Sequence, residues 1–192
     1  MNPWLKHVEK WQNCKACRLC QGRQKVVLAR GDLPCDILFV GEAPGESEDC
    51  LGIPFVGPAG QLLDWIISQA LGLADQAHGY NTLRKAFTNL VCCIPRDEEG
   101  GKASEPDHDS IQACSGRLSE FIRLASPKLL VAVGKLAKEY IEPGYKHSVK
   151  RSSKIPFIEI HHPAYILRAS QAQQSLLAQR CIVKLKNAVE EL

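Results

Sequence analysis

Four apolar runs, each short enough to be one strand, recur along the chain and are separated by segments with helical periodicity. The runs cover residues 36–41, 86–92, 128–134 and 155–161, and the helical patterns cover 61–71, 109–124, 135–141 and about 170–192. Continuous apolar runs are typical of parallel strands that are buried on both faces and joined by crossover helices. The alternation therefore predicts an α/β fold, a three-layer α/β/α sandwich with a central, mostly parallel four-stranded sheet.

Length and composition indicate one domain. With 192 residues, 45% of them hydrophobic and 23% charged, the chain can bury a sizeable core, and we expect a single domain over residues 1–192. No apolar stretch is long enough for a membrane span, and the first residues lack the apolar run of a signal peptide. We expect a soluble, cytoplasmic monomer without a membrane partner. The net charge of +3 is compatible with a polyanionic partner but does not identify one.

Three of the four predicted strands end in unusual loops. These are GEAPGESED at 41–49, CCIPRDEEGG at 92–101 and HHPAYILR at 161–168. Ligands of open parallel sheets bind at the carboxyl ends of the strands, so the chemistry is expected where these loops converge. The segment 96–109 is polar and rich in Gly, Pro, Asp and Glu, which predicts an exposed loop.

Nine cysteines are unusual in a chain with no sign of secretion, and their odd number argues against a disulfide scaffold. Cys14 and Cys17 form a CxxC pair, and Cys93 and Cys114 follow far downstream. Two ligands from one turn and two from elsewhere suit a tetrahedral zinc ion or a [4Fe-4S] cluster. Cys20 extends the pair to a CxxCxxC run and is an alternative ligand. Buried or surface thiols are the other interpretation, and we expect it for the remaining four, Cys35, Cys50, Cys92 and Cys181.

The segment 40–64, VGEAPGESEDCLGIPFVGPAGQLLD, is the most specific stretch of the sequence. It resembles motif one of the family 4 (iron-sulfur) uracil-DNA glycosylases, which contains GEAPG, then ED, then G-x-PFVG-x-AG-x-LLD. Three further features match in order: the sequence TNLV at 88–91 with Cys93 and Pro95 after it, the four cysteines, and HPAYILR at 162–168. The resemblance runs from about residue 14 to residue 168.

The resemblance implies roles for the residues of a base pocket. Asn89 would read the edge of a pyrimidine, Phe55 would stack on the base, and Glu48 would exclude the methyl group of thymine. An enzyme that acts on a base extrudes it and holds it by stacking and by edge hydrogen bonds, so an aromatic ring and an amide are suitable side chains. Glycines allow the backbone to approach a nucleotide closely, and we place Gly41 and Ala43 in the pocket. Without the resemblance, Phe55 would be interpreted as a core aromatic residue and Asn89 as a turn residue.

Two catalytic residues are expected. The resemblance implies that His162 donates to a base oxygen, where a fixed donor stabilises the negative charge of the departing base. His161 is expected to end the last strand and to be dispensable. Related families place an aspartate directly after the position of Glu42, where this sequence has Ala43. Glu42 is therefore the candidate that orients or activates water, although a carboxylate that holds its own loop is an equally good interpretation.

DNA contact is expected from the last motif. Ile166 or Leu167 would wedge into the duplex in the place of the extruded base, and Arg168 would bind a phosphate. The alternative is the start of an ordinary helix after Pro163. The resemblance also implies that Cys14, Cys17, Cys93 and Cys114 bind a [4Fe-4S] cluster in a largely structural role.

Two departures from the family pattern bear on specificity. The interval between Cys93 and Cys114 is longer than usual, and the segment 94–109 replaces the usual CRPP-x-NR run. A basic KRRIH loop, with which a related group captures its product covalently, is absent from the sequence. Three functions remain open: excision of uracil from DNA as the first step of base excision repair, the same chemistry on another deaminated or modified base, and noncatalytic binding of nucleic acid.

Overall fold

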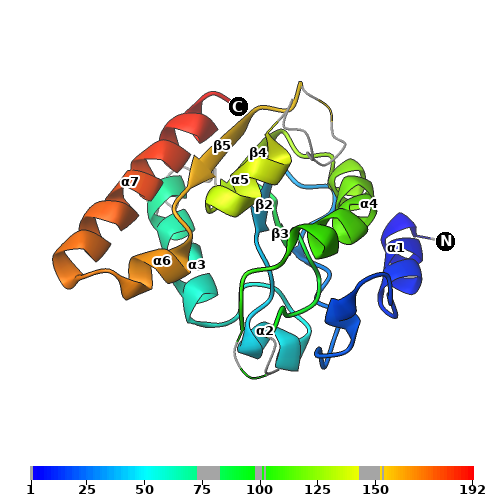
Figure 1. Ribbon diagram of the computed structural model, residues 1–192. Coiled ribbons are helices and arrows are strands. Elements are labelled where there is room, and N and C mark those ends of the chain that lie inside the picture. Colours follow the sequence, from blue (N-terminus) through cyan, green and yellow to red (C-terminus); the bar gives the residue numbers. More distant parts are fainter. Residues whose placement is uncertain (1, 73–82, 98–100, 102, 143–151, 153) are drawn as a thin grey trace.

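The four apolar runs of the sequence form the four parallel strands of the sheet, β2 (Ile37–Gly41), β3 (Lys85–Asn89), β4 (Leu129–Val133) and β5 (Phe157–Ile160). They are neighbours in the order β3-β2-β4-β5 and pair in parallel. The computed structural model describes residues 2–72, 83–97, 101, 103–142, 152 and 154–192 (Figure 1). The α/β prediction with a mostly parallel sheet is confirmed.

The sheet has five strands in the described part of the chain, one more than the sequence predicted. The additional strand, β1 (Arg30–Gly31), pairs antiparallel with β3 at the edge. A strand of two residues leaves no periodic signal, which is why the sequence did not reveal it. Gly31 is required there, because its φ is 104° and a Cβ atom would lie 2.1 Å from the carbonyl oxygen of Lys85.

β3 is shorter than the apolar run that predicted it. It ends at Asn89, which pairs with Gly41, the last residue of the neighbouring β2. Beyond this pair the regular strand ends, although the amide of Leu90 still donates to the carbonyl of Gly41 at 2.9 Å. Residues 90–94 remain buried in the loop that follows. Their apolar character therefore reflects burial rather than a strand.

Helices cover both faces of the sheet (Figure 1). Alternate strand residues such as Leu38 and Val40 pack against α4 (His108–Ala125) and α5 (Lys135–Ile141), with α1 (Pro3–Trp11) beside α4. The intervening residues, such as Ile37 and Phe39, pack against α3 (Pro58–Leu71), α6 (Pro163–Arg168) and α7 (Gln171–Glu190). This alternation follows from the two-residue period of a strand and produces two separate cores.

The predicted helices are present, and the sequence missed four short or terminal ones. These are α1, η1 (Arg18–Cys20), α2 (Glu46–Leu51) and α6. The missed α-helices have six to nine residues, too few for a clear hydrophobic period. The sequence allowed an ordinary helix after Pro163 as the alternative to a DNA-binding loop, and α6 is such a helix. Several of its residues nevertheless line the cavity described below. No described helix is long and apolar enough to cross a membrane.

Candidate active site

A cavity with a volume of about 720 Å³ opens at the carboxyl ends of the parallel strands. The loops after β2, β3, β4 and β5 converge on it, as the sequence predicted from their position. Most of the predicted catalytic and base-binding residues line it: Glu42, Ala43, Glu48, Phe55, Asn89 and His162. Gly41 lies directly behind its wall, in contact distance of Phe55 and Asn89.

Gly41 allows an aromatic ring and an amide to meet at the base of the cavity. A Cβ atom on Gly41 would lie 2.5 Å from Oδ1 of Asn89 and 2.6 Å from Cζ of Phe55. Only a residue without a side chain fits there. Asn89 is 3% exposed and Phe55 is 7% exposed, so both are held firmly while their faces line the cavity.

Phe55 has an unusual backbone conformation, with a φ of 57°. A residue other than glycine in the left-handed region costs on the order of 1 kcal/mol, so packing must maintain it. Gly60 makes this packing possible, since a Cβ atom there would lie 2.0 Å from the carbonyl oxygen of Phe55. The ring also packs near Phe87, with 6.0 Å between centroids. The loop thus contains a strained backbone conformation that places the Phe55 ring at the cavity.

Glu48 organises the loop that carries Phe55. One carboxylate oxygen accepts hydrogen bonds from the amides of Val56 and Gly57 at 2.9 and 2.8 Å, and the other accepts one from Gly45 at 3.1 Å. Together these bonds tie residues 45, 56 and 57 to one side chain of α2. The function expected for Glu42 as an alternative, a carboxylate that holds loop amides, therefore belongs to Glu48.

Glu42 is placed differently from Glu48. It follows β2 directly, lines the cavity, and receives no hydrogen bond on its carboxylate from the residues that the structure describes. Burial raises the pKa of Glu42 to about 7, the nearby Glu105 carboxylate adds to the rise, and the Arg168 charge opposes it. A carboxylate with unengaged oxygens and a pKa near neutrality is suited to accept a proton from water.

His162 caps α6 with its own side chain. Nδ1 accepts a hydrogen bond from the amide of Ala164 at 3.2 Å, which requires a neutral ring with its proton on Nε2. Burial, and to a smaller extent the Arg168 charge, lower the pKa of His162 to about 4. The ring is consequently neutral at physiological pH, and its remaining N–H group can serve as a donor in the cavity.

Gly134, at the end of β4, lets the two candidate catalytic residues approach. Its φ is 101°, and a Cβ atom there would lie 2.6 Å from Oε1 of Glu42 and 3.1 Å from Cβ of His162. Gly134 is the last residue of the apolar run 128–134, but the sequence contains no motif that connects it with residues 42 and 162. Its signal was weak because a single glycine after a strand is common.

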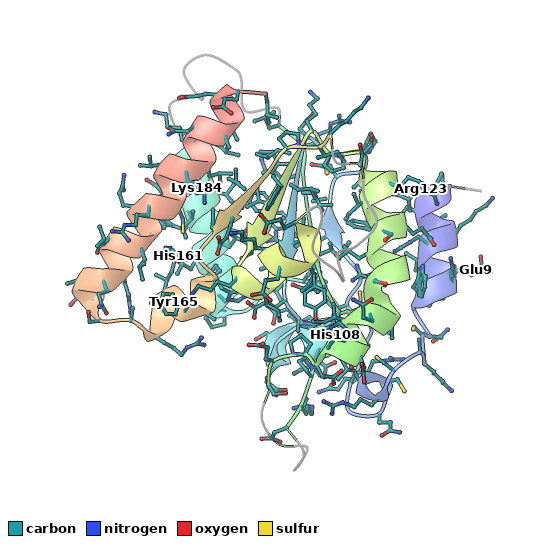
Figure 2. The ribbon with its side chains drawn as sticks, turned by 45° about the horizontal axis from the view of Figure 1, so that its top comes forward. Glu9, His108, Arg123, His161, Tyr165 and Lys184 are labelled. Atoms are coloured by element: carbon teal, nitrogen blue, oxygen red, sulfur yellow. The ribbon has the colours of Figure 1, made fainter. Side chains whose placement is uncertain are left out.

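The segment after β5 carries both histidines and the expected DNA-binding residues. His161 lies one residue beyond β5 and also lines the cavity, with its ring centroid 6.1 Å from that of Tyr165. Figure 2 shows these two side chains together near α6. Leu167 is 42% exposed, and Arg168 is exposed at the rim of the cavity.

Ile166 requires a correction. It is 1% exposed and packs in the core with α3 and α7, so it cannot enter a duplex unless α6 leaves the sheet. Helical geometry explains the difference, because neighbouring residues are rotated by roughly 100° about the axis of α6, so that Ile166 faces the core while Leu167 faces solvent. Of the two wedge candidates, only Leu167 is available at the surface.

The atypical polar loop contributes to the cavity wall. Described residues 103–106 line the cavity, among them Glu105. Arg96 anchors the loop by bidentate contacts with Glu46 at 2.7 and 2.9 Å and by a 3.0 Å bond to the carbonyl of Gly22. The sequence predicted an exposed loop here and, for its first residues, a place among the loops that converge on the site, and residues 103–106 do line the cavity. Residues 98–100 and 102 of this loop lie outside the described residues.

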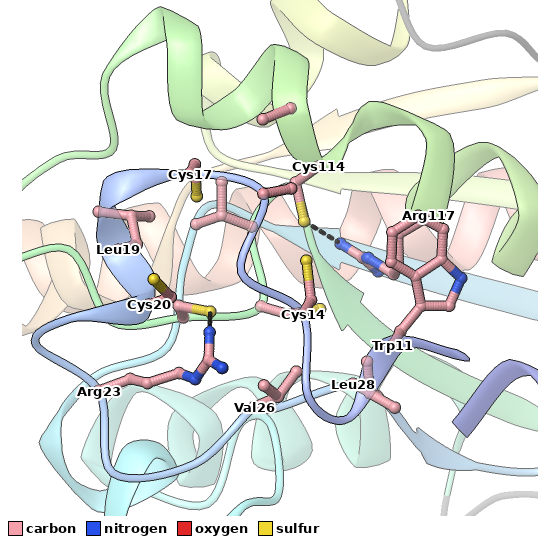
Figure 3. A pocket seen from close by; sticks show the side chains of 15 residues that line it. Trp11, Cys14, Cys17, Leu19, Cys20, Arg23, Val26, Leu28, Cys114 and Arg117 are labelled. Atoms are coloured by element: carbon pink, nitrogen blue, oxygen red, sulfur yellow. Dashed lines mark hydrogen bonds between the residues drawn. The ribbon is translucent and has the colours of Figure 1, made fainter. Parts of the chain in front are cut away.

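A second pocket is lined by cysteines (Figure 3). It contains all four predicted ligands, Cys14, Cys17, Cys93 and Cys114, and two further cysteines, Cys20 and Cys92. Cys92 is 3% exposed, as expected for a buried thiol, and it also contributes to the wall of this pocket. Among the described residues, no group of three or more His, Cys, Asp and Glu side chains is arranged to hold a metal ion directly.

Two arginines test whether this pocket fits an anionic iron-sulfur cluster. Nη1 of Arg23 lies 3.2 Å from Sγ of Cys93, and Nη2 of Arg117 lies 3.8 Å from Sγ of Cys114. Arg117 is 1% exposed, its Nε has no partner, and within the described chain no carboxylate forms an ion pair with it. A buried cation needs an anionic partner. Thiolates bound to a cluster carry this charge, so the pocket fits the group.

Comparisons with known proteins agree with these observations. The sequence model of the uracil DNA glycosylase superfamily matches residues 29–186. A type-4 uracil-DNA glycosylase of Thermotoga maritima is 30% identical over 191 residues, which cover 95% of this chain and 93% of that protein. Another, of Sulfurisphaera tokodaii, is 41% identical over 130 residues, which cover 67% of this chain and 53% of that protein. The chain belongs to the uracil DNA glycosylase superfamily and, within it, to the type-4 family.

A third comparison bears on the fold alone. The crystal structure of Pedobacter heparinus SMUG2 superimposes with a TM-score of 0.55 at 14% identity, covering 81% of this chain and 76% of that one. The chain spans only about half the length of two relatives. The match covers 53% of the Sulfurisphaera protein and 55% of a type-4 uracil-DNA glycosylase of Saccharolobus solfataricus. The activity of this chain is therefore argued from its own site.

Proposed function

We propose that this protein extrudes uracil from DNA and hydrolyses its N-glycosidic bond, which starts base excision repair. The names of its relatives support this substrate, and so does the arrangement of the cavity. The observation that carries the proposal is the state of His162: it lines the cavity and its Nδ1 is occupied by the amide of Ala164, which leaves Nε2–H as the donor of a neutral ring.

The chemistry follows from where the charge develops. When the bond between C1′ and N1 breaks, both electrons go to the base, which leaves as an anion. His162 donates through Nε2 to a base oxygen and stabilises this anion without transferring a proton to it. Removal of one such fixed donor typically slows a reaction by about a hundredfold to a thousandfold. The low pKa of His162, about 4, keeps the ring a donor of one defined tautomer.

Recognition of the base is assigned to Asn89 and Phe55. The Asn89 amide offers one acceptor and one donor, which match N3–H and O4 of uracil. The Phe55 ring stacks on the base, Ala43 contributes to the wall of the pocket, and Gly41 lies behind this wall and leaves room for Phe55 and Asn89. Glu48 excludes the thymine methyl group by fixing the loop from 45 to 57 close to the base, rather than through a free carboxylate.

Glu42 is assigned to the water. Its carboxylate accepts a proton from the attacking water while the water oxygen forms the new bond to C1′. Gly134 allows this carboxylate to lie next to His162. The residue that activates the water and the residue that stabilises the leaving base are therefore neighbours. Arg168, at the cavity rim, binds a phosphate, and the exposed Leu167 fills the space of the extruded base.

Residues Cys14, Cys17, Cys93 and Cys114 would hold a [4Fe-4S] cluster. When bound, the cluster supplies a crosslink between the N-terminal segment, the loop after β3 and α4. Arg23 and Arg117 compensate the negative charge of the thiolates. Cys20 lines the same pocket and stays an alternative ligand.

We further propose that the protein acts as a monomer in the cytoplasm. The nine cysteines are unpaired, and a reducing compartment keeps such thiols available as ligands.

A second base is a specific alternative because the atypical loop contributes Glu105 to the cavity. A panel of labelled DNA substrates decides between the possibilities. Each substrate carries one base, among them uracil, hypoxanthine, xanthine and modified cytosines, and free base is measured. Release of uracil faster than any other base supports the proposal. Release of another base alone identifies the second possibility, and binding without release of any base identifies a noncatalytic module.

A further inference from the structure

Arg117 joins the cysteine pocket to the base cavity. It lies on α4, 1% exposed, one turn after Cys114. Figure 3 shows its guanidinium group beside Cys114 at the wall of the cysteine pocket. The same group reaches the end of β3, where the strand delivers Asn89 to the cavity.

The guanidinium group holds three consecutive residues of the chain. Nη1 donates to Oγ1 of Thr88 at 2.8 Å, and Nη2 donates to the backbone carbonyls of Asn89 and Leu90 at 2.5 and 3.0 Å. Thr88 in turn donates to the carbonyl of Leu28 at 2.8 Å. The carbonyls at the end of β3 lie where the sheet ladder stops, so Arg117 supplies the donors that a neighbouring strand would otherwise provide.

The electrostatics of Arg117 connect it to the cysteines. No carboxylate of the described chain pairs with it, and the thiols of residues 92, 93 and 114 are its nearest anionic candidates. An unpaired buried cation is costly, whereas one that faces thiolates on one side and carbonyl dipoles on the other is compensated on both. One buried charge therefore depends on both regions at once.

We propose that Arg117 is a positioning residue that fixes the end of β3, and with it the orientation of Asn89, while its charge is balanced by the ligands of the cysteine pocket. The expected effect of Arg117 on uracil cleavage rests on the proposed function. Its expected effect on the reduction potential of the cluster does not depend on that function. According to this proposal, the cluster does more than crosslink the chain, because its ligands also stabilise the residue that positions Asn89 in the base pocket.

Two variants separate the halves of this proposal. Arg117→Lys keeps the positive charge but loses the planar group that serves the carbonyls of residues 89 and 90 together. Arg117→Met removes both the charge and the donors. Arg123→Met, an exposed arginine on the same helix, is the control. All proteins are purified without oxygen, and iron content, the midpoint reduction potential of the cluster, DNA affinity and single-turnover cleavage are measured, each per iron-loaded molecule.

We expect Arg117→Lys to retain the potential and to cleave uracil about ten- to a hundredfold more slowly, because a misplaced reactive contact has effects of this size. Arg117→Met shows the same or a larger loss and a lower potential, because a positive charge next to the cluster is removed. DNA affinity changes less than about threefold in both, since Asn89 acts after the base is extruded. Arg123→Met behaves like the unmodified protein.

The proposal is overturned if Arg117→Lys cleaves at the normal rate per iron-loaded molecule, or if Arg117→Met leaves the potential unchanged. A loss that follows only the folded fraction, as measured by thermal unfolding, also overturns it, because that result indicates a purely structural residue. If Arg117→Met does not fold, the Lys variant still decides. Failure of the unmodified protein to release uracil would instead refute the proposed function, and the potentials would still test the charge balance.

Discussion

The base cavity and the cysteine pocket lie at opposite sides of the end of β3 and use polar groups in opposite ways. Glu42 and His162 line the cavity, and among the described residues no hydrogen bond is made by the Glu42 carboxylate or by Nε2 of His162. In the cysteine pocket, the polar groups face one another, with Arg23 on Cys93 and Arg117 on Cys114. The comparison shows how the two kinds of group differ. The candidate catalytic groups keep a donor or acceptor without a partner in the described part of the chain, whereas the supporting groups have their hydrogen bonds and charges matched by other residues.

The same contrast separates two carboxylates of one loop. Glu48 accepts three backbone hydrogen bonds, whereas Glu42 accepts none from the described residues. Both line the cavity and both are glutamates in a glycine-rich segment. Only the hydrogen bonds distinguish the residue that builds the loop from the one that remains available for chemistry.

The largest effect is expected at Asn89. In Asn89→Asp the donor to O4 of uracil becomes an acceptor, so we expect uracil excision to fall on the order of 10⁴-fold, with weak gain on cytosine. Single-turnover base release from uracil and cytosine substrates measures this. Asp64→Asn, the reverse change from carboxylate to amide at an exposed residue of α3 that pairs with Arg30, should leave uracil release unchanged. Uracil release at the normal rate would remove Asn89 from the pocket.

The cysteine pocket should respond in stability and iron content rather than in specificity. Cys17→Ser and Cys114→Ser are expected to lose the iron and at least about 2 kcal/mol of stability, roughly 4–8 °C in Tm for a chain of this size. Iron analysis and thermal unfolding measure both. Cys181→Ser, on the buried face of α7, should leave the iron content unchanged. Iron loss in Cys20→Ser but not in Cys93→Ser would reassign the ligands.

Glu42 should impose a pH dependence on the cavity that the cysteine pocket lacks. If the ionised carboxylate accepts the proton of water, cleavage rises with pH, about tenfold per unit, until it levels near the Glu42 pKa of about 7. Glu105→Gln removes a neighbouring negative charge, lowers the pKa of Glu42 and moves the curve to lower pH. Glu42→Gln removes the rise. A curve unchanged by both substitutions would exclude Glu42 as the base.

The smallest effect is expected at the rim. Leu167→Ala should reduce cleavage of duplex DNA by roughly tenfold and leave single-stranded DNA unaffected, because only a duplex has a gap to fill. Ile166→Val is the matched comparison and should cost about 1 kcal/mol of stability with normal DNA affinity, because Ile166 packs in the core. The opposite assignment of the two effects would show that α6 rearranges on DNA.

The sequence predicted the sheet, its main helices and most cavity residues, because these depend on long periodic runs and on contiguous motifs. It could not predict contacts between residues far apart in the chain. Gly134 beside Glu42 and His162, and Arg117 beneath Asn89, are single residues with no local pattern, and their roles arise only from the fold. Ile166 and Leu167 were indistinguishable in the sequence, since only the orientation of α6 decides which one is buried.

The most direct test of the account compares His162→Ala with His161→Ala in single-turnover cleavage and in DNA binding. Both histidines line the cavity, but only His162 has Nδ1 fixed by a backbone amide. We predict that His162→Ala slows cleavage by about a hundredfold to a thousandfold with DNA affinity nearly unchanged, because the lost hydrogen bond is strongest in the transition state. His161→Ala should keep most activity. Equal losses in both variants, or a His162 defect confined to DNA affinity, would contradict the account and assign the chemical step to Glu42.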